Sequence, residues 1–345
     1  MNTNTLKQIS NPLLKWYYQN ARILPWRDNP MPYYVWISEI MLQQTRVEAV
    51  KPYFIRFIES LSDVKSLACV DDEKLMKLWE GLGYYNRARN LKKAAQIIVE
   101  QYNGELPAQY DKLCELPGIG PYTAGAIASI AFHLPVPAVD GNVLRVISRV
   151  LGSKKNISEL KVKQEMQQKI QEMLPEDVSG FNQALMELGA IICIPNGAPK
   201  CDICPLNEIC NANQRGIQLK IPIKSKKNAR KVENLTVLII QYHDKIGIRK
   251  RIQKGVLFDL WELPNVNKKL TMQQIETQLK EWGITPLSIR SQSNAKHIFT
   301  HIEWHMNAYY IETYDVENIN LFEWVTIQQL SQDYALPTAF KKLLK

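Results

Sequence analysis

The chain has 345 residues, of which 46% are hydrophobic and 22% are charged, and its formal net charge at pH 7 is +9. This length accommodates two hydrophobic cores without disulfide support, and the composition excludes a wholly disordered chain. The positive charge favours a polyanionic partner, either nucleic acid or an acidic membrane surface.

The N-terminal residues, Met1 to Leu14, are polar and lack the charged-then-apolar pattern of a secretion signal. No apolar run reaches the length of about 20 residues that a membrane-spanning helix needs. We therefore expect a cytoplasmic protein without a membrane anchor.

From Leu13 to about Gly189 the apolar residues recur at helical spacing, which predicts an almost wholly helical domain. Within it, residues 36–46 place Glu39 among apolar neighbours. A lone glutamate in a helix is normally a solvated surface residue. Apolar surroundings would instead raise its pKa and hold a proton ready for a leaving group.

Residues 109–132 form a predicted helix-hairpin-helix motif around the sequence LPGIGPYTAG. Gly118 and Gly120 permit a tight turn, and Pro121 suits the first turn of the following helix. Free backbone N–H groups at a positive helix end favour binding of one DNA phosphate. The alternative is a plain connector between two helices.

Further along the chain, the sequence Val-Asp-Gly-Asn-Val (residues 139–143) opens a helix predicted to reach Leu151. Asp140 is expected to cap this helix. The same carboxylate would also stabilise a developing sugar cation at the mouth of a cleft. N–H groups of the cap would keep Asp140 ionised, which the second role requires.

A group of cysteines crowds into the predicted loop 193–210, with the spacing C-x7-C-x2-C-x5-C: Cys193, Cys201, Cys204 and Cys210. The other two cysteines, Cys69 and Cys114, stand alone. Four thiolates hold either zinc or a 4Fe–4S cluster. Zinc ribbons usually offer two separate Cys-x-x-Cys pairs, so the spacing favours the cluster.

The C-terminal part changes character after a basic stretch, which we assign as a linker over residues 221–233. Strands are predicted at 235–242, at 246–252 and, as one long strand, from His297 to Tyr314, with a helix near 273–282. We therefore expect a helical domain over residues 1–220 and an α+β domain over residues 234–345.

The hairpin, the Val-Asp-Gly-Asn-Val sequence and the cysteine loop together resemble the endonuclease III superfamily of DNA glycosylases. Residues 38–45, 81–85 and 181–189 resemble its MutY branch, the adenine DNA glycosylases. The similarity runs from Leu13 to the C-terminus. It implies a multidomain protein: an all-α glycosylase domain with a 4Fe–4S cluster, followed by a Nudix-like (MutT-like) domain.

The resemblance implies a role for each matching residue. Glu39 matches the residue that protonates adenine at N7, and Asp140 matches the carboxylate that stabilises or traps the sugar. Tyr122 and Asn142 match residues that assist at this centre. Tyr122 stands where bifunctional members carry a Schiff-base lysine, which implies a monofunctional enzyme. The implied partner is double-stranded DNA with an A:8-oxoguanine or A:G mispair, bound by a monomer that flips the adenine out.

The resemblance also implies contacts with the DNA and the lesion, made by Arg27, Gln44, Thr45, Leu82, Tyr84, Gly118, Gly120, Gln183, Phe299, Thr300 and His301. Gln44 as plain helix surface and Tyr84 as plain core are the alternatives. The family usually has serine where this chain has Thr300, and six residues rather than seven after the first cysteine. Two groups of basic residues face either DNA or solvent: Arg87, Arg89, Lys92 and Lys93 beside Tyr84, and Lys200 in the cysteine loop.

The second domain lacks the glutamate-rich Nudix box, since its helix near 273–282 holds only Glu276 and Glu281. No Mg²⁺ site is evident, so we interpret this domain as a recognition module. One rival is a bifunctional pyrimidine-lesion glycosylase, which Tyr122 disfavours. Another is a DNA-binding protein without catalytic activity. A DNA repair enzyme would associate with the nucleoid.

Overall fold

The chain divides into two compact units in the computed structural model, which describes residues 6–225, 229–317 and 319–344. Unit 1 comprises Met1–Val70 and Arg89–Lys226, and unit 2 comprises Asp71–Ala88 and Lys227–Lys345. Unit 2 therefore includes a short segment from the N-terminal half of the chain. Of the expected linker, residues 226–228 lie outside the described residues, and strand β1 already begins at Lys231.

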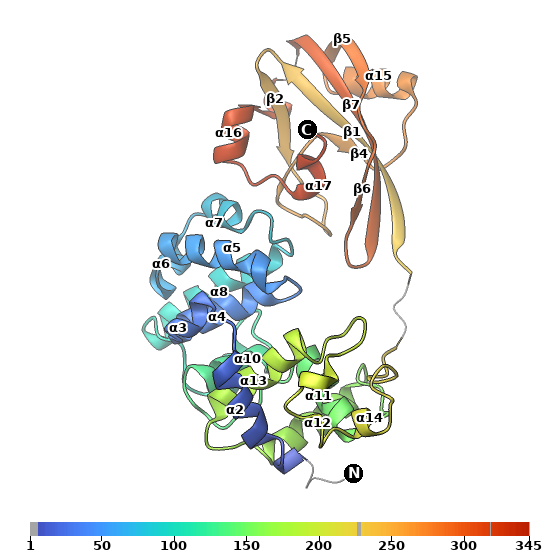
Figure 1. The fold of residues 1–345 in the computed structure, drawn as a ribbon. Helices are drawn as coiled ribbons and strands as arrows, with labels where there is room; N and C mark the ends of the chain where they lie inside the picture. Colours follow the sequence, from blue (N-terminus) through green and yellow to red (C-terminus); the bar gives the residue numbers. More distant parts are fainter. Residues whose placement is uncertain (1–5, 226–228, 318, 345) are drawn as a thin grey trace. The chain divides into compact units, whose positions relative to one another are not determined.

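Unit 1 is built from helices, as the periodicity predicts (Figure 1). In chain order they are α2 (Ser10–Asn20), α3 (Pro25–Asp28), α4 (Pro32–Leu42), α5 (Val47–Ser60), α6 (Val64–Cys69), α8 (Asn86–Tyr102), α9 (Tyr110–Glu115), α10 (Pro121–Ile130), α11 (Gly141–Leu151), α12 (Leu160–Gln171), α13 (Val178–Ile191), the 3-10 turn η1 (Cys201–Ile203) and α14 (Asn211–Gln214). Helix α8 starts in unit 2 and continues into unit 1. No helix in the described part of the chain is long and apolar enough to cross a membrane.

The core of unit 1 forms where α2, α11 and α13 pack together. Helix α11 buries Val143, Val146, Ile147 and Val150, which share one face at helical spacing. Leucines and a phenylalanine of α2 and α13 complete this cluster. Because α11 is anchored along its length, its N-terminus, where Asp140 lies, has a fixed position.

The hairpin forms as predicted, with α9 ending at Glu115 and α10 beginning at Pro121. Gly118 has a φ of +80°, and a Cβ there would lie 2.9 Å from the Cβ of Asn90. Both the conformation and the close approach require glycine. Gly120 is the N-cap residue of α10, so the N–H groups after it point out of the helix end.

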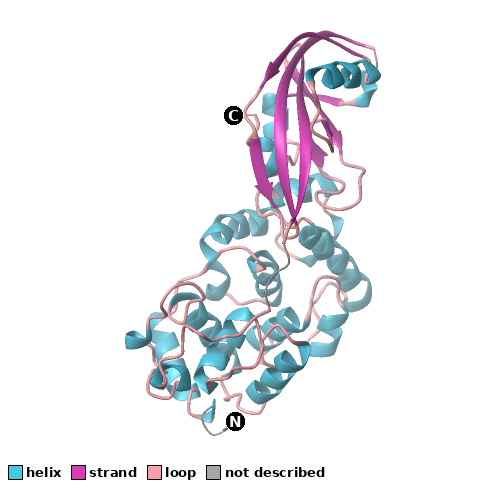
Figure 2. Cartoon of the chain, turned by 90° about the vertical axis from the view of Figure 1, so that its right-hand side faces the viewer, coloured by secondary structure: helices cyan, strands magenta, loops and turns pink. Residues whose placement is uncertain are grey.

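Unit 2 contains a mixed sheet, whose strands are drawn in magenta in Figure 2. The strands are β1 (Lys231–Tyr242), β2 (Lys245–Lys250), β3 (Trp261–Glu262), β4 (Asn265–Val266), β5 (Ile284–Ser291), β6 (Ala295–Ile298), β7 (Ile302–Val316) and β8 (Glu323–Thr326). Its helices are α7 (Asp72–Trp79), α15 (Met272–Glu281), α16 (Ile327–Gln332) and α17 (Thr338–Lys341), with the 3-10 turn η2 (Ile319–Leu321).

The main strand order is β3-β2-β1-β7-β5, and β1 runs parallel to β7 along its whole length. Leu235, Val237 and Ile239 pack on one face of β1, in the cluster that includes α16 and α17. Leu238 and Ile240 pack on the other face, against α15. Burial on both faces explains why the sequence of β1 is continuously apolar instead of alternating.

The single strand predicted from His297 to Tyr314 is wrong. The structure has two antiparallel strands there, β6 and β7, joined by a tight turn. In the turn, the N–H of Phe299 donates to the carbonyl oxygen of Ile302 at 2.8 Å. The alternating pattern runs through the turn, and no glycine or proline marks it. This turn is the segment expected to read the lesion.

Candidate active site

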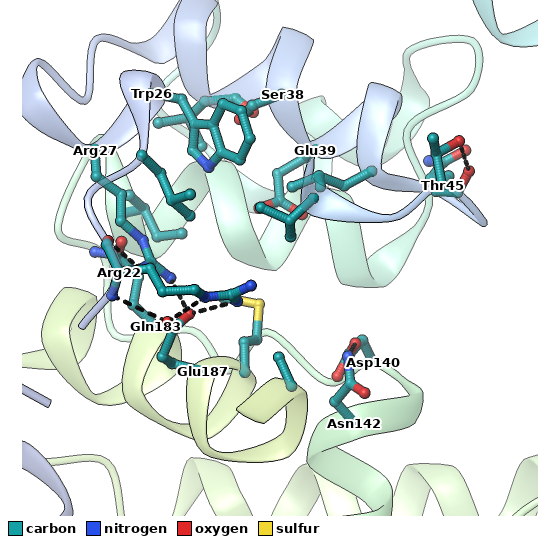
Figure 3. Close-up of a pocket in the computed structure, with 18 of the residues that line it drawn as sticks. Arg22, Trp26, Arg27, Ser38, Glu39, Thr45, Asp140, Asn142, Gln183 and Glu187 are labelled. Atoms are coloured by element: carbon teal, nitrogen blue, oxygen red, sulfur yellow. Dashed lines mark hydrogen bonds and ion pairs between the residues drawn. The ribbon is translucent and has the colours of Figure 1, made fainter. Parts of the chain in front are cut away.

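A pocket of about 480 Å³ in unit 1 brings together the four residues expected at the catalytic centre. Glu39 comes from α4, Tyr122 from α10, and Asp140 and Asn142 from the start of α11. Figure 3 shows Glu39 on one side of this pocket and Asp140 with Asn142 on the other. The volume is typical of a site for one small molecule or one base.

Glu39 is buried, with 6% of its surface exposed, inside the most apolar part of α4. Burial raises the pKa of Glu39 to about 7, and the charge of Asp140 acts in the same direction. A 2.6 Å hydrogen bond from the hydroxyl of Tyr122 to Oε2 of Glu39 partly offsets this increase. Near neutral pH, Glu39 is therefore able to hold a proton and to release it.

Asp140 caps α11, as predicted. Its Oδ1 accepts a 2.7 Å hydrogen bond from the N–H of Val143, and its Oδ2 accepts one of 2.7 Å from Nδ2 of Asn142. We expected the cap to keep the pKa low. Burial instead raises the pKa of Asp140, although these hydrogen bonds and the charge of Arg145 oppose the rise. Asp140 has more donors than Glu39 has, which makes it the better anion of the two.

Arg145 lies behind this carboxylate and fixes the side chain of Asn142. It is 3% exposed. Its Nη2 donates to Oδ1 of Asn142 at 2.9 Å and to the carbonyl oxygen of Gly189 at 2.7 Å. Its Nε donates to the carbonyl oxygen of Cys193 at 2.8 Å. These bonds turn the amide group of Asn142 toward Asp140, and they join the start of α11 to the cysteine loop.

Sequence reasoning missed a buried ion pair in the pocket wall. Glu187 of α13 has a 1% exposed side chain and binds Nε of Arg22 at 2.6 Å and Nη2 of Arg27 at 2.9 Å. Burial alone would raise the pKa of Glu187, but the hydrogen bond from Arg22 and the charge of Arg27 lower it. Glu187 lies between the apolar residues Met186 and Leu188. A single acidic residue among apolar neighbours is the sequence signal that singled out Glu39, and it applies equally to Glu187.

The pocket is also lined by four residues expected to contact DNA: Arg27, Gln44, Thr45 and Gln183. Gln44 lies two residues after Leu42, the last residue of α4, and is exposed, with a φ of +59°. Left-handed backbone is uncommon for a residue other than glycine and often occurs at functional sites. Gln44 is therefore not plain helix surface, and it lies on the rim of the pocket that contains Glu39.

Apart from Gly118 and Gly120 in the hairpin turn, the remaining predicted contacts lie in unit 2. Tyr84 is not core: it is 45% exposed, with a φ of +49°, and its hydroxyl lies 3.0 Å from Oγ1 of Thr300. Phe299 packs against Trp304, with ring centroids 4.8 Å apart, while Thr300 and His301 are exposed. Leu82, by contrast, is only 6% exposed and does not present its side chain at the surface.

The four clustered cysteines line one small cavity together with Arg149. Nη1 of Arg149 donates to Sγ of Cys193 at 3.2 Å, and Sγ of Cys210 lies 3.4 Å from the carbonyl oxygen of Arg149. Burial raises the pKa of Cys204 to about 12, and the other three thiols of the group act in the same direction. None of the cysteines forms a disulfide.

The four thiols that line this cavity are a donor set that fits a 4Fe–4S cluster, in which each thiolate would bind one iron. Gly197, with a φ of +76°, lies in the seven-residue gap that follows Cys193.

Comparison with known proteins identifies both parts of the chain. Residues 37–172 match the family described as HhH-GPD superfamily base excision DNA repair protein, and residues 236–345 match the NUDIX domain family. The adenine DNA glycosylase of Buchnera aphidicola subsp. Acyrthosiphon pisum (strain APS) is 35% identical, covering 97% of this chain and 96% of that protein. The adenine DNA glycosylase of Homo sapiens is 31% identical, covering 96% of this chain and 72% of that protein.

Solved structures show the same helical fold. A thermostable thymine-DNA glycosylase has a TM-score of 0.56 and 28% identity, covering 61% of this chain and 97% of its own. A trapped endonuclease III–DNA covalent intermediate has a TM-score of 0.54 and 25% identity, covering 63% of this chain and 99% of its own. The expected architecture, a helical glycosylase domain followed by a Nudix-like domain, is confirmed. The chain belongs to the adenine DNA glycosylases of the helix-hairpin-helix base-excision repair superfamily.

Proposed function

We propose that this chain hydrolyses the N-glycosidic bond of adenine mispaired with 8-oxoguanine, or with guanine, in double-stranded DNA and leaves an abasic site. Membership of the adenine DNA glycosylases gives the base and the bond. The observation that carries the proposal is the pair of carboxylates in one pocket, Glu39 with a pKa of about 7 and Asp140 with several donors.

The burial of Glu39 supports a base-flipping reaction. Its carboxyl group lies inside the pocket and is 6% exposed, so a base stacked within a duplex does not reach it. Rotating the adenine out of the helix brings its ring into this pocket. Gln44 on the rim is placed to occupy the space that the base leaves, and backbone N–H groups of the hairpin turn at Gly118 and Gly120 suit a phosphate of the same strand.

The two carboxylates divide the chemistry between them. Glu39 donates its proton to N7 of adenine, so that the base leaves as a neutral group when the bond from C1′ to N9 breaks. The electron pair of that bond goes to the base, and positive charge develops on the sugar. Asp140 stabilises this charge, held by Asn142 and the N–H of Val143. A water molecule then adds to C1′ and gives its proton to the carboxylate of Glu39, which restores the acid.

Tyr122 supports a monofunctional reaction. A Schiff base needs an amine, and a phenol does not form one. No lysine lines the pocket in the part of the chain that the structure describes. Cleavage of the DNA strand would then require added alkali. The bifunctional pyrimidine-lesion glycosylase remains the rival enzyme, and it lacks the required nucleophile here.

The ion pair of Glu187 suits recognition of adenine. Two guanidinium groups keep its carboxylate charged at the pocket wall. The exocyclic amine of adenine donates hydrogen bonds, whereas guanine presents a carbonyl oxygen at the same place in the ring. A charged acceptor favours the amine and repels the carbonyl oxygen.

Unit 2 is proposed to read the base opposite the adenine. Thr300 and His301 are exposed at the tip of the turn between β6 and β7, while Phe299 anchors that turn on Trp304. The hydroxyl of Thr300 keeps the hydrogen-bonding capacity of the serine that is usual in the family. A Nudix hydrolase reaction is not proposed, because α15 carries only Glu276 and Glu281 as carboxylates.

We further propose that the cysteine loop holds a 4Fe–4S cluster through Cys193, Cys201, Cys204 and Cys210. Such a cluster would cross-link residues 193–210 through thiolate bonds and so stabilise the loop. Arg149 places positive charge beside the sulfur of Cys193. Purified protein with a brown colour and iron and sulfide in equal amounts would support this, whereas stoichiometric zinc would contradict it.

The experiment that tests the proposal is excision from a labelled duplex with adenine opposite 8-oxoguanine, analysed with and without hot alkali. Strand breakage only after alkali is the expected result. Breakage without alkali would favour the bifunctional rival. No abasic product from folded protein that binds the duplex would favour a DNA-binding protein without catalytic activity, and in that case Glu39→Gln would change nothing.

A further inference from the structure

Glu80, the residue directly after helix α7, is bound by three groups of unit 2. Oε1 of Glu80 accepts a 2.8 Å hydrogen bond from the N–H of Leu336. Its Oε2 lies 2.8 Å from Nζ of Lys341 and 3.0 Å from Nζ of Lys77. The side chain of Glu80 is only 12% exposed. Charge-assisted bonds to a mostly buried carboxylate are among the stronger hydrogen bonds in proteins.

The rest of α7 makes further contacts of this kind with the C-terminal part of unit 2. Nζ of Lys77 donates to the carbonyl oxygen of Tyr334 at 3.0 Å. At the start of the helix, Oε2 of Glu73 accepts a 2.7 Å hydrogen bond from Nε1 of Trp261, and Glu73 also pairs with Lys250. Helix α7 is therefore held at both ends.

A braced turn connects Glu80 to Tyr84. Gly81 and Gly83 have φ values of +101° and +69°, which gives the turn its shape. Nε1 of Trp79 donates to the carbonyl oxygen of Gly83 at 3.1 Å. Nη2 of Arg87 donates to the same oxygen, also at 3.1 Å, and its guanidinium carbon lies 5.5 Å from the ring centroid of Tyr84. Because these bonds make the turn rigid, a shift in the position of Glu80 should also shift the position of Tyr84.

The segment that Glu80 binds also supports the lesion-reading turn. Leu336 and Phe340 belong to the same buried cluster as Trp304. The rings of Trp304 and Phe340 have centroids 5.9 Å apart, and the ring centroid of Phe299 lies 4.8 Å from that of Trp304. Thr300 follows Phe299 directly. Tyr84 and Thr300, the two sides of the contact, are therefore each held by groups that join at the segment bound by Glu80.

We propose that Lys77 and Glu80 are positioning residues for lesion discrimination, which hold Tyr84 against Thr300. This inference rests on the proposed role of Thr300 in reading 8-oxoguanine. On one side, the turn after Glu80 leads to Tyr84, whose hydroxyl lies 3.0 Å from Oγ1 of Thr300. On the other side, Phe299, next to Thr300, packs on Trp304, and Trp304 packs on Phe340 in the segment that Glu80 binds. Removing the carboxylate of Glu80 breaks the bonds that join the turn before Tyr84 to the segment containing Leu336 and Phe340.

The test uses the full-length enzyme and single-turnover excision of adenine opposite 8-oxoguanine and opposite guanine. Glu80→Ala is expected to lower the ratio of the two rates about ten-fold, the effect of losing one strong hydrogen bond. Glu80→Gln should have a smaller effect, because its side-chain oxygen still accepts from Leu336. Glu48→Gln is the matched control, since Glu48 is exposed and pairs with Lys51 at the same i,i+3 spacing in unit 1.

A double-mutant cycle separates positioning from simple stabilisation. Thr300→Val should itself lower the ratio, and adding Glu80→Ala to it should lower the ratio little further, because both changes break one path. Additive losses would overturn the proposal, and so would an unchanged ratio in folded Glu80→Ala or Glu80→Gln. Wild-type enzyme that excises adenine equally from both duplexes would overturn the lesion-reading role of Thr300. Wild-type enzyme that excises none would overturn the proposed function instead.

Discussion

The hydroxyl of Tyr122 donates a 2.6 Å hydrogen bond to Oε2 of Glu39 inside the pocket. Tyr122 is the second residue of α10, directly after the turn that we expect to bind a DNA phosphate. Glu39 and this turn are thus linked by one side chain. Because the bond favours the ionised carboxylate, it opposes the effect of burial and helps to set the pKa of Glu39 at about 7.

Removing this hydrogen bond should move the pH dependence of excision. The active form of Glu39 is protonated, so the wild-type rate should fall as pH rises through about 7. In Tyr122→Phe the pKa of Glu39 should rise, since the bond that lowers it is gone, and the rate should fall only at higher pH. The measurement is the single-turnover rate across the neutral range. An unchanged midpoint would show that Glu39 is not the titrating acid.

Replacing the acid should separate activity from stability. Glu39→Gln should lower the excision rate by a factor on the order of 10²–10⁴, because no proton is delivered to the leaving base. The variant should nevertheless bind mispaired DNA.

The stability of the same variant should exceed that of the wild type above neutral pH. Folding raises the pKa of Glu39 from 4.5 to about 7, so its favourable contribution is complete below 4.5 and is lost as pH rises through 7. Glutamine avoids this loss, which is worth roughly 3 kcal/mol at most. Denaturant unfolding at two pH values measures it, with exposed Glu48→Gln as the control. Equal stabilities at alkaline pH would contradict the assignment.

Local patterns made much of unit 1 predictable. The helices, the hairpin turn and the cap at Asp140 depend on residues close together in the sequence, and each formed as predicted. The burial of Glu39 follows from its apolar neighbours in the same helix. Glu187 carries the same signal but was not singled out, because its partners Arg22 and Arg27 lie more than half of unit 1 away in sequence.

Long-range contacts explain what the sequence did not reveal. Glu73 and Trp261 are 188 residues apart in the sequence, and a local sequence pattern does not predict a hydrogen bond over that separation. The sequence therefore did not predict that residues 71–88 belong to unit 2. The turn at Phe299 was missed for a different reason. Its shape depends on packing against Trp304, whereas its sequence continues the alternation of the strands.

A methyl group at Gly189 should disturb the catalytic centre through Asn142. A Cβ there would lie 2.7 Å from the Cβ of Asn142, on a helix whose backbone leaves little room to adjust. Gly189→Ala should therefore displace Asn142 and weaken its 2.7 Å bond to Asp140, with a fall in excision rate of at least about ten-fold. The control is the denaturant unfolding of Gly189→Ala itself, which shows whether the variant remains folded. A normal rate in Gly189→Ala would contradict the role of Asn142.

The buried pair of Glu187 leads to a prediction about both stability and pH. Glu187→Gln leaves Arg22 and Arg27 without their counter-charge at the pocket wall, which should cost about 3 kcal/mol of unfolding free energy. The matched control is Glu165→Gln, which breaks the more exposed pair with Lys155 and should cost about 1 kcal/mol or less.

The effect of pH on this cost has a definite sign. Folding lowers the pKa of Glu187 from 4.5, so its contribution to stability is present above that value and is lost as pH falls below it. The stability difference between wild type and Glu187→Gln, measured by denaturant unfolding, should therefore be largest near neutral pH and shrink in acid. Because glutamine also presents an amide donor to the base, excision of adenine should slow at neutral pH, where unfolding is negligible. A variant that is destabilised but excises adenine at the wild-type rate would show that Glu187 supports the pocket wall and does not select the base.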